Sequence, residues 1–266
     1  MSARRFIDLS LPIEAGPSER VPVQIRYVDH RRGAEEMSAI FGVPPEALPG
    51  GLGWAGEEVT LITHAGTHMD APWHYGPGSE GHRARYIEEV PLEWCFAPGL
   101  VLDFRSKVDG DVITAADLES SLRSIDHDLC PGEIVLIMTG ADSYWGDASY
   151  PERGAGLGRE ATLWLVQRGV RVIGTDAWGF DRSFEAMRQA YVETRDARVV
   201  WPAHFAGREH EYCQLEKLTN LSKLPPTGFV VICFPVKVAR AGAGWLRAVA
   251  MIEEPTAIGT EVQTNA

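Results

Sequence analysis

The chain has 266 residues, of which 45% are hydrophobic and 23% are charged, and its net charge at neutral pH is −12. These proportions are typical of a globular protein and exclude an intrinsically disordered chain. An acidic chain lacks the basic face that contacts phosphate groups, so we expect neither nucleic acid nor an anionic membrane as a partner. The sequence has no apolar stretch of about 18 residues and no signal peptide pattern, so we expect a cytoplasmic protein without a transmembrane helix.

The N-terminal third contains short predicted elements. Alternation of apolar and polar residues predicts a strand over residues 5–12. Residues 33–48 are predicted to be helical in two pieces, which the prolines at 44–45 separate. Residues 57–63 form a candidate strand that leads into a histidine-rich segment, and residues 100–104 form another short strand.

The middle of the chain predicts a βαβ unit. Residues 133–138 are almost continuously apolar, which is typical of a strand covered on both faces. A long loop, 140–158, precedes a helix over 159–168 that Gly169 ends, and residues 170–175 form the next strand.

The remaining signals complete a single domain. Thr114, with Asp117 three residues later, predicts the start of a helix. Residues 229–234 and 245–252 are predicted strands. Without repeats or linkers, the chain is predicted to be one mixed α/β domain over residues 1–266, of which 255–266 form a loose tail.

The cysteines predict free thiols. None belongs to a C-x-x-C pair, and each lies beside apolar residues or in a strand-like run. In a reducing compartment we expect buried thiols rather than disulfides. The four residues are Cys95, Cys130, Cys213 and Cys233.

The histidine-rich segment is the most informative part of the sequence. Imidazole and carboxylate groups are the usual ligands of zinc and manganese. Gly66 and Pro72 disfavour a continuous helix, so we predict a loop whose side chains converge on one ion. The alternative is a set of separate polar side chains, each bonded to the backbone. The candidate residues are His64, His68, Asp70 and His74.

A second cluster lies far along the chain. It holds His204, His210, Gln214 and Glu216 within thirteen residues. Taken alone, this segment is best interpreted as the solvated face of a helix. Its role in chemistry depends on the first cluster.

The segment from His64 to His74 resembles the H-x-G-T-H-x-D-x-P-x-H signature of the cyclase family of metal-dependent hydrolases, which includes bacterial kynurenine formamidase and isatin hydrolase. The resemblance extends from residues 7–10 to residues 234–237 and 244–248 near the C-terminus. It implies a mixed α/β fold of the swivelling β/β/α type and a homodimer or larger homo-oligomer.

The resemblance also implies a set of metal ligands. His64, His68 and Asp70 would hold a first ion, and His204 and Glu216 would hold a second ion with Asp70 as a bridge.

The same resemblance assigns His74 as the acid–base residue. The alternative roles for His74 are a further metal ligand and a residue that orients Asp70. The chain is longer than a typical formamidase, and isatin hydrolase-like members use one manganese with a glutamine ligand. Gln214 is therefore an alternative ligand, and the metal is one or two ions of zinc or manganese per chain.

Other residues are candidates for substrate binding. An aromatic pocket for a flat substrate is one interpretation of five aromatic residues, and burial in the core is the other. Asp176 and Asp181 suit either a site or helix capping, and Arg159 is a candidate for binding an anionic product. The five aromatic residues are Trp54, Trp73, Tyr75, Trp178 and Phe180.

These observations predict a metal-dependent hydrolase. Metal-activated water would attack a small amide, formamide, cyclic imide or lactone, and His74 would transfer the proton. The alternatives are aromatic polyketide cyclisation and metal binding without catalysis. The chain lacks a G-x-S-x-G elbow, which argues against a serine hydrolase. The glycine run over residues 154–158 lacks G-x-G-x-x-G spacing and follows no predicted strand, which argues against a dinucleotide site there.

Overall fold

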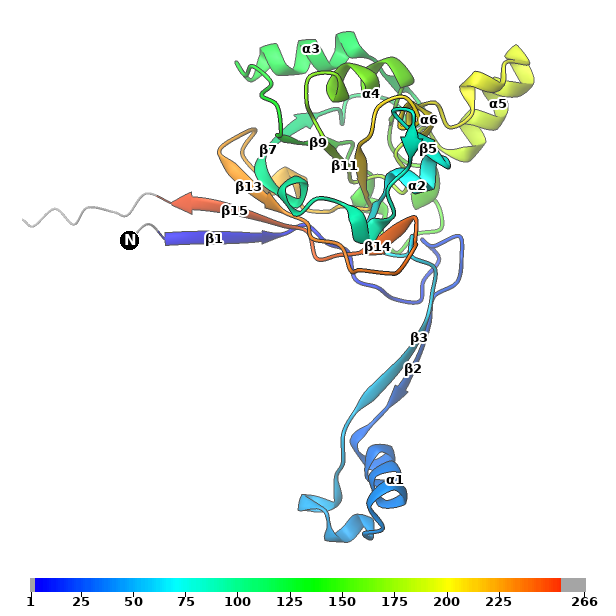
Figure 1. Cartoon of the computed structure of the whole chain (residues 1–266), viewed down its shortest axis with the longest axis vertical. Coiled ribbons are helices and arrows are strands. Elements are labelled where there is room, and N and C mark those ends of the chain that lie inside the picture. The colour runs from blue at the N-terminus through cyan, green and yellow to red at the C-terminus, as the bar shows by residue number, and fades with distance from the viewer. Residues whose placement is uncertain (1–2, 255–266) are drawn as a thin grey trace, which may run out of the picture.

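A computed structural model describes residues 3–254, in which a nine-stranded mixed sheet is the central element (Figure 1). The four central strands, β7, β9, β11 and β12, run parallel to one another, and the others pair antiparallel. Across the sheet the strands are β1 (Ala3–Asp8), β15 (Val249–Glu254), β13 (Phe229–Ile232), β7 (Phe96–Asp103), β9 (Ile134–Met138), β11 (Val172–Thr175), β12 (Cys213–Glu216), β4 (His68–Asp70) and β14 (Ala243–Trp245).

The helices and minor strands surround this sheet. The helices are α1 (His30–Phe41), α2 (Pro72–Tyr75), α3 (Ala115–Ser124), α4 (Arg159–Val166), α5 (Phe184–Thr194) and α6 (Pro202–Ala206). Three short strand pairs lie outside the sheet: β2 (Gln24–Val28) with β3 (Gly56–Thr60), β5 (Gly78–Ser79) with β6 (His82–Arg83), and β8 (Val112–Ile113) with β10 (Gly156–Leu157).

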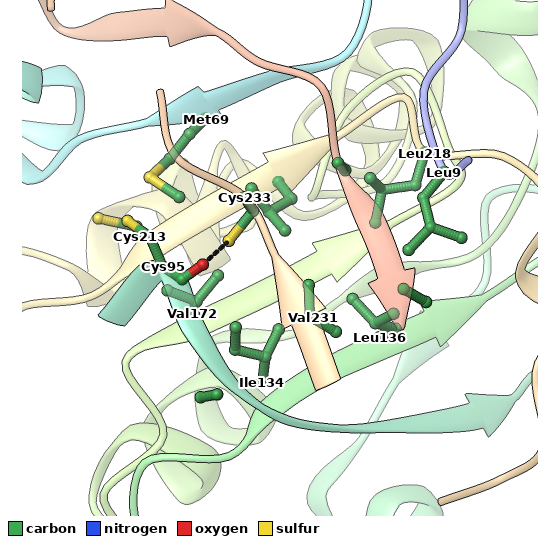
Figure 2. Packing of buried hydrophobic residues seen from close by; sticks show 14 of the residues in the cluster. Leu9, Met69, Cys95, Ile134, Leu136, Val172, Cys213, Leu218, Val231 and Cys233 are labelled. Carbon is green, nitrogen blue, oxygen red and sulfur yellow. Dashed lines mark hydrogen bonds between the residues drawn. The ribbon is translucent and has the colours of Figure 1, made fainter. Parts of the chain in front are cut away.

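Strand β9 carries the core on both of its faces, as its continuous apolar sequence predicts. Val135 and Ile137 pack with apolar residues of α3 and α4, which cover one face of the sheet. Leu136 packs in the cluster on the other face, part of which Figure 2 shows. That cluster also contains Ile7 of β1 and Met69 of β4, which lie toward opposite ends of the strand order, so the sheet curls around it.

The βαβ unit and the capped helix confirm their predictions. Thr114 Oγ1 accepts a hydrogen bond from the amide of Asp117, and α3 follows directly. After α4 the chain turns at Gly169, whose φ of 90° favours glycine, and enters β11.

Several predicted strands have different bounds. The strand predicted over 5–12 is β1, which ends at Asp8, and the one predicted over 57–63 is β3, which ends at Thr60. The strand predicted over 100–104 is part of the longer β7. The predicted strand over 245–252 is divided between β14 and β15, because the chain leaves the edge of β4 and crosses to a position between β1 and β13. The predicted tail, 255–266, lies outside the described residues.

Strands β2 and β3, with α1 between them, extend away from the sheet as an arm (Figure 1). The first predicted helical piece is α1, which Asp29 caps and Gly42 ends at a φ of 66°. The second piece forms only 3₁₀ turns at Pro45–Ala47 and Pro49–Gly51, because closely spaced prolines cannot donate backbone hydrogen bonds.

Three of the four cysteines are buried free thiols, namely Cys95, Cys213 and Cys233 (Figure 2). The prediction of burial is wrong for Cys130, which is exposed in the loop before β9. Among the described helices, none has the length and hydrophobicity required to cross a bilayer.

Replacing Leu136 by alanine should lower the free energy of unfolding by about 2–5 kcal/mol, since it leaves a cavity in the middle of the sheet. Urea denaturation followed by circular dichroism measures this change. Val108→Ala, at an exposed position, is the control and should change stability by about 0.5 kcal/mol or less. Equal effects of the two variants would contradict the description of the core.

Candidate metal centre

Two neighbouring antiparallel strands bring the candidate ligands together. In their register, His68 of β4 lies opposite Glu216 of β12, and Asp70 lies opposite Gln214. Side chains alternate between the faces of a strand, so these four polar residues share one face. The intervening residues, Met69 and Leu215, pack in the apolar cluster on the other face. Residues 68–70 were predicted as loop, and this prediction is wrong: they form a short buried strand.

The carboxylate of Asp70 lies among four imidazole rings. Its Oδ1 is 2.8 Å from Nδ1 of His64 and 3.2 Å from Nε2 of His68. Its Oδ2 is 3.8 Å from Nε2 of His74 and 3.7 Å from Nε2 of His204. Residues from two distant segments therefore converge on one side chain.

Asp70 is buried, and although its Oδ1 lies 2.8 Å from Nδ1 of His64, neither of its oxygens accepts a hydrogen bond of suitable geometry from the described residues. Burial alone would raise the pKa of this carboxyl group, but the rings of His64, His74 and His68 hold it well below its usual value. A buried carboxylate whose lone pairs are unused is the donor expected of a cation ligand. The donor set of imidazole and carboxylate groups fits zinc or manganese.

Glu216 lies beside the same cluster. Its Oε2 is 3.5 Å from Nε2 of His68, its Oε1 is 3.7 Å from Nε2 of His204, and its Oε1 accepts a hydrogen bond from the amide of Phe180. Burial and the neighbouring Asp70 carboxylate raise the pKa of Glu216. A bound metal ion would offset both the loss of hydration and the repulsion between the carboxylates of Glu216 and Asp70.

The potential ligand atoms form two groups that share Asp70. One group is His64, Asp70 and His74, and the other is His68, Asp70 and Glu216, with the atoms of each group within 4.8 Å of one another. This grouping differs from the one that the family resemblance implies, because it places the ring of His74 within ligand distance.

His204 is held by Asp181 from outside the cluster. The carboxylate of Asp181 contacts Nδ1 of His204 and accepts a hydrogen bond from the amide of Ala203, at the start of α6. Burial alone would lower the pKa of His204, but the bond to Asp181 and the nearby carboxylates raise it to about 10. Asp181 thus combines the two roles considered for it, since it caps α6 and fixes the ring of His204.

The other residues of the second cluster occupy different positions. Gln214 is buried beside Asp70, where its Nε2 donates to the hydroxyl of Tyr212 while its Oε1 lacks a described partner. His210 lies outside the cluster, and its Nδ1 is 3.7 Å from Glu80. The interpretation of this segment as a helix face is wrong, because Cys213–Glu216 is the buried strand β12.

A cavity of about 240 Å³ opens onto the cluster. The rings of His64, His74 and His204 line it together with Glu216. Its apolar wall includes Ile62, Trp178, Phe180, Phe184 and Trp201. Two of the five predicted aromatic residues, Trp178 and Phe180, are therefore part of this cavity.

The other three predicted aromatic residues do not line the cavity. Trp54 lies in the arm, where its Nε1 donates to Glu36. The ring of Trp73 packs against that of Tyr86, with 4.7 Å between centroids. Tyr75 is buried, and its hydroxyl donates to the carbonyl of Asp70, so it stabilises the backbone of strand β4.

Several charged residues also differ from the sequence predictions. Some lie at other positions than predicted, and others line the cavity without having been predicted. Arg159 pairs with Glu209 outside this cavity, whereas Arg20 lines it. The carboxylate of Asp176 accepts hydrogen bonds from the amides of Thr139 and Gly140, so it fixes the turn after β9.

Glu19 and Lys217 also line the cavity. Glu19 and Arg20 follow a segment rich in proline and glycine that has no periodic pattern, so the sequence carries no signal for them. For Lys217 the one signal in the sequence was its position directly after Glu216, a candidate metal ligand.

Comparison with known proteins identifies the family. Residues 7–182 match the protein family described as "Putative cyclase". The chain therefore belongs to this family.

Named relatives extend this result. The chain is 27% identical to the isatin hydrolase of Roseibium aggregatum over 208 residues, which cover 73% of each chain. It is 30% identical to the kynurenine formamidase of Maricaulis maris, over 72% of this chain and 78% of that protein. The structure of isatin hydrolase A from Ralstonia solanacearum superposes with a TM-score of 0.75 and 23% identity, over 94% of this chain and 92% of that one.

The mixed α/β fold is therefore confirmed by a solved structure. The relatives are hydrolases, and the structure groups metal-ligating side chains in one cluster, which confirms the predicted class of a metal-dependent hydrolase.

Asp70→Ala should remove bound metal, because Asp70 is the residue that both ligand groups share. Inductively coupled plasma mass spectrometry of the purified protein measures its metal content and checks this prediction. His210→Ala is the matched control and should retain the wild-type metal content, since it lies outside the cluster. Retention of metal by the Asp70 variant would mean that the ligands lie elsewhere.

Proposed function

We propose that this protein hydrolyses a small aromatic amide, formamide, cyclic imide or lactone with the help of one or two divalent metal ions. The observation that carries this proposal is the buried carboxylate of Asp70, which has no hydrogen-bond partner among the described residues and lies among four imidazoles, three of which line an aromatic cavity. The names of the relatives support it, since isatin is a cyclic amide fused to an aromatic ring and a formamidase cleaves a formamide.

The metal ligands in this proposal are those that the cluster offers. His64, His68 and Asp70 would hold one ion, and His204 and Glu216 would complete the site of a second ion if two are bound. Gln214 is the alternative ligand for a single-ion site, since its Oε1 lacks a described partner. A bound divalent ion would lower the pKa of a water molecule, to ~7 in the case of zinc, and would polarise the carbonyl group under attack.

His74 is assigned the proton transfer. It lies at the cavity wall with its side chain 22% exposed, and burial is the main cause that lowers its pKa to about 4. The ring is therefore neutral at pH 7, so a ring nitrogen is free to accept a proton from the attacking water. The same nitrogen then donates this proton to the departing nitrogen or oxygen of the substrate.

The cavity indicates the kind of substrate. Its volume lies below the ~300–1,000 Å³ of sites for drug-sized ligands, which favours a small molecule. Trp178, Phe180 and Trp201 offer flat apolar surfaces for an aromatic ring. The guanidinium of Arg20 pairs with Glu152 and lines the cavity, with its Cζ 5.3 Å from the ring centroid of Trp178. In this proposal it also attracts the carboxylate that hydrolysis of an amide or lactone releases.

A substrate panel tests the proposal. The metal-loaded protein is assayed with isatin, N-formyl derivatives of aromatic amines and aromatic lactones, and hydrolysis of at least one is expected. A protein that binds metal tightly but cleaves none of them would instead favour metal binding without catalysis.

His74→Ala should lower kcat by about 10²–10⁴, the usual contribution of a positioned acid–base group. Metal content should stay close to that of the wild type, because Asp70, His64 and His68 remain. The loss should be smaller for substrates with good leaving groups, which need less protonation. Loss of the metal from this variant would make His74 a ligand instead.

We also propose that the chain is a homo-oligomer located in the cytoplasm. The arm supports self-association, because it exposes Tyr27 to 72%, Ile40 to 65% and Phe41 to 60% in the single chain. Such apolar surface on a projecting element is typical of an interface.

Light scattering of the purified protein should therefore give at least twice the chain mass of 29.2 kDa. Phe41→Glu should shift the mass toward that of the single chain, because it places a charge in the apolar surface. Val108→Glu is the control, since Val108 is at least as exposed as Phe41 but lies outside the arm. A wild-type protein with the mass of one chain would refute the assembly.

A further inference from the structure

A buried ion pair lies beside the metal centre without belonging to its ligands. Lys217 is only 1% exposed, and its Nζ is 2.6 Å from Oε2 of Glu19, whose side chain is also buried. The Nζ also lies 4.9 Å from the ring centroid of Trp178. Charged groups are seldom buried unless they are paired, so the burial of these two side chains indicates a specific structural role.

Both charges also bind the turn that carries the first metal ligands. The ammonium group of Lys217 donates to the carbonyl of His64 at 2.8 Å, and the amide of Gly66 donates to Oε1 of Glu19 at 2.7 Å. Gly66 has a φ of 61°, which favours glycine. The ion pair therefore holds the first and third residues of the turn His64–Gly66.

This turn also orients the ring of His68. The carbonyl of Gly66 lies 2.9 Å from Nδ1 of His68, and since a carbonyl only accepts, Nδ1 carries the proton. Nε2 then presents its lone pair toward Asp70 and Glu216. Because Lys217 follows Glu216 directly, the same ion pair connects the turn to the strand of another ligand.

We propose that Glu19 and Lys217 are positioning residues that set the affinity of the centre for a divalent metal ion. They act by fixing the turn that aims His64 and His68 at Asp70. This inference rests on the proposed function, since it takes the cluster to be a metal site. It assigns a role to a residue of the N-terminal segment that no motif in the sequence marks.

A double variant separates positioning from simple charge neutralisation. Glu19→Leu with Lys217→Met removes both charges and keeps apolar volume, so it leaves no unpaired charge in the interior. If the pair serves only to neutralise its own charges, this variant binds metal as the wild type does. If the pair positions the turn, the variant folds but has lost both hydrogen bonds to it, and its metal affinity falls by about 10–100-fold.

The experiment is a calorimetric titration of the metal-free protein with Zn²⁺ alone and Mn²⁺ alone, with the melting temperature measured in parallel. Lys217→Arg keeps a charged donor and should retain more affinity than Lys217→Met. Lys107→Met is the matched control, because Lys107 also pairs with a carboxylate, Asp117, and donates to a backbone carbonyl away from the site.

A folded double variant with wild-type metal affinity would overturn the proposal. If the double variant does not fold, Glu19→Gln with Lys217→Met decides: the glutamine oxygen still accepts from the amide of Gly66, but the bond from Lys217 to the carbonyl of His64 is lost, and unchanged metal affinity would again refute the role. Since no substrate is present, these results stand apart from the hydrolase assay. Failure to cleave any substrate would refute the proposed reaction and leave the positioning role intact.

Discussion

The site depends on keeping one ionised carboxylate, that of Asp70, inside the protein. Burial opposes ionisation, and only the surrounding imidazoles or a metal ion compensate for it. These groups come from a turn, from α2, from α6 and from β4 itself, while β12 adds Glu216. The antiparallel contact of β4 with β12 is therefore the constraint that brings the two halves of the site together.

The sequence predicted the local half of this arrangement well. His64, His68, Asp70 and His74 lie within eleven residues, and a close local cluster of ligand types needs little knowledge of the fold. His204 and Glu216 were reached only through resemblance to a family, because nothing local indicates which distant strand pairs with β4. The core strands and the capped helix α3 were predictable because each has a strong local pattern.

The rest depends on tertiary contacts that local patterns do not encode. Strand β4 has three residues, which is too short for alternation to be recognised, and β12 places polar residues at alternate buried positions. Polar residues in a buried strand imitate the pattern of a solvated helix, which explains the wrong interpretation of residues 213–216. Glu19 meets Lys217 across the fold, so their partnership has no signal in the sequence.

The order of strands in the sheet has a consequence for synthesis of the chain. Strand β1 is made first but pairs with β15, which is the last described strand, and among the described residues β4 pairs with β12 and β14. Such contacts between distant segments form slowly and raise the contact order of the fold. During translation the segment His68–Asp70 must therefore wait, without a partner strand, until residues 213–216 have emerged from the ribosome. Metal uptake at the complete site is consequently a late event, which follows folding of most of the chain.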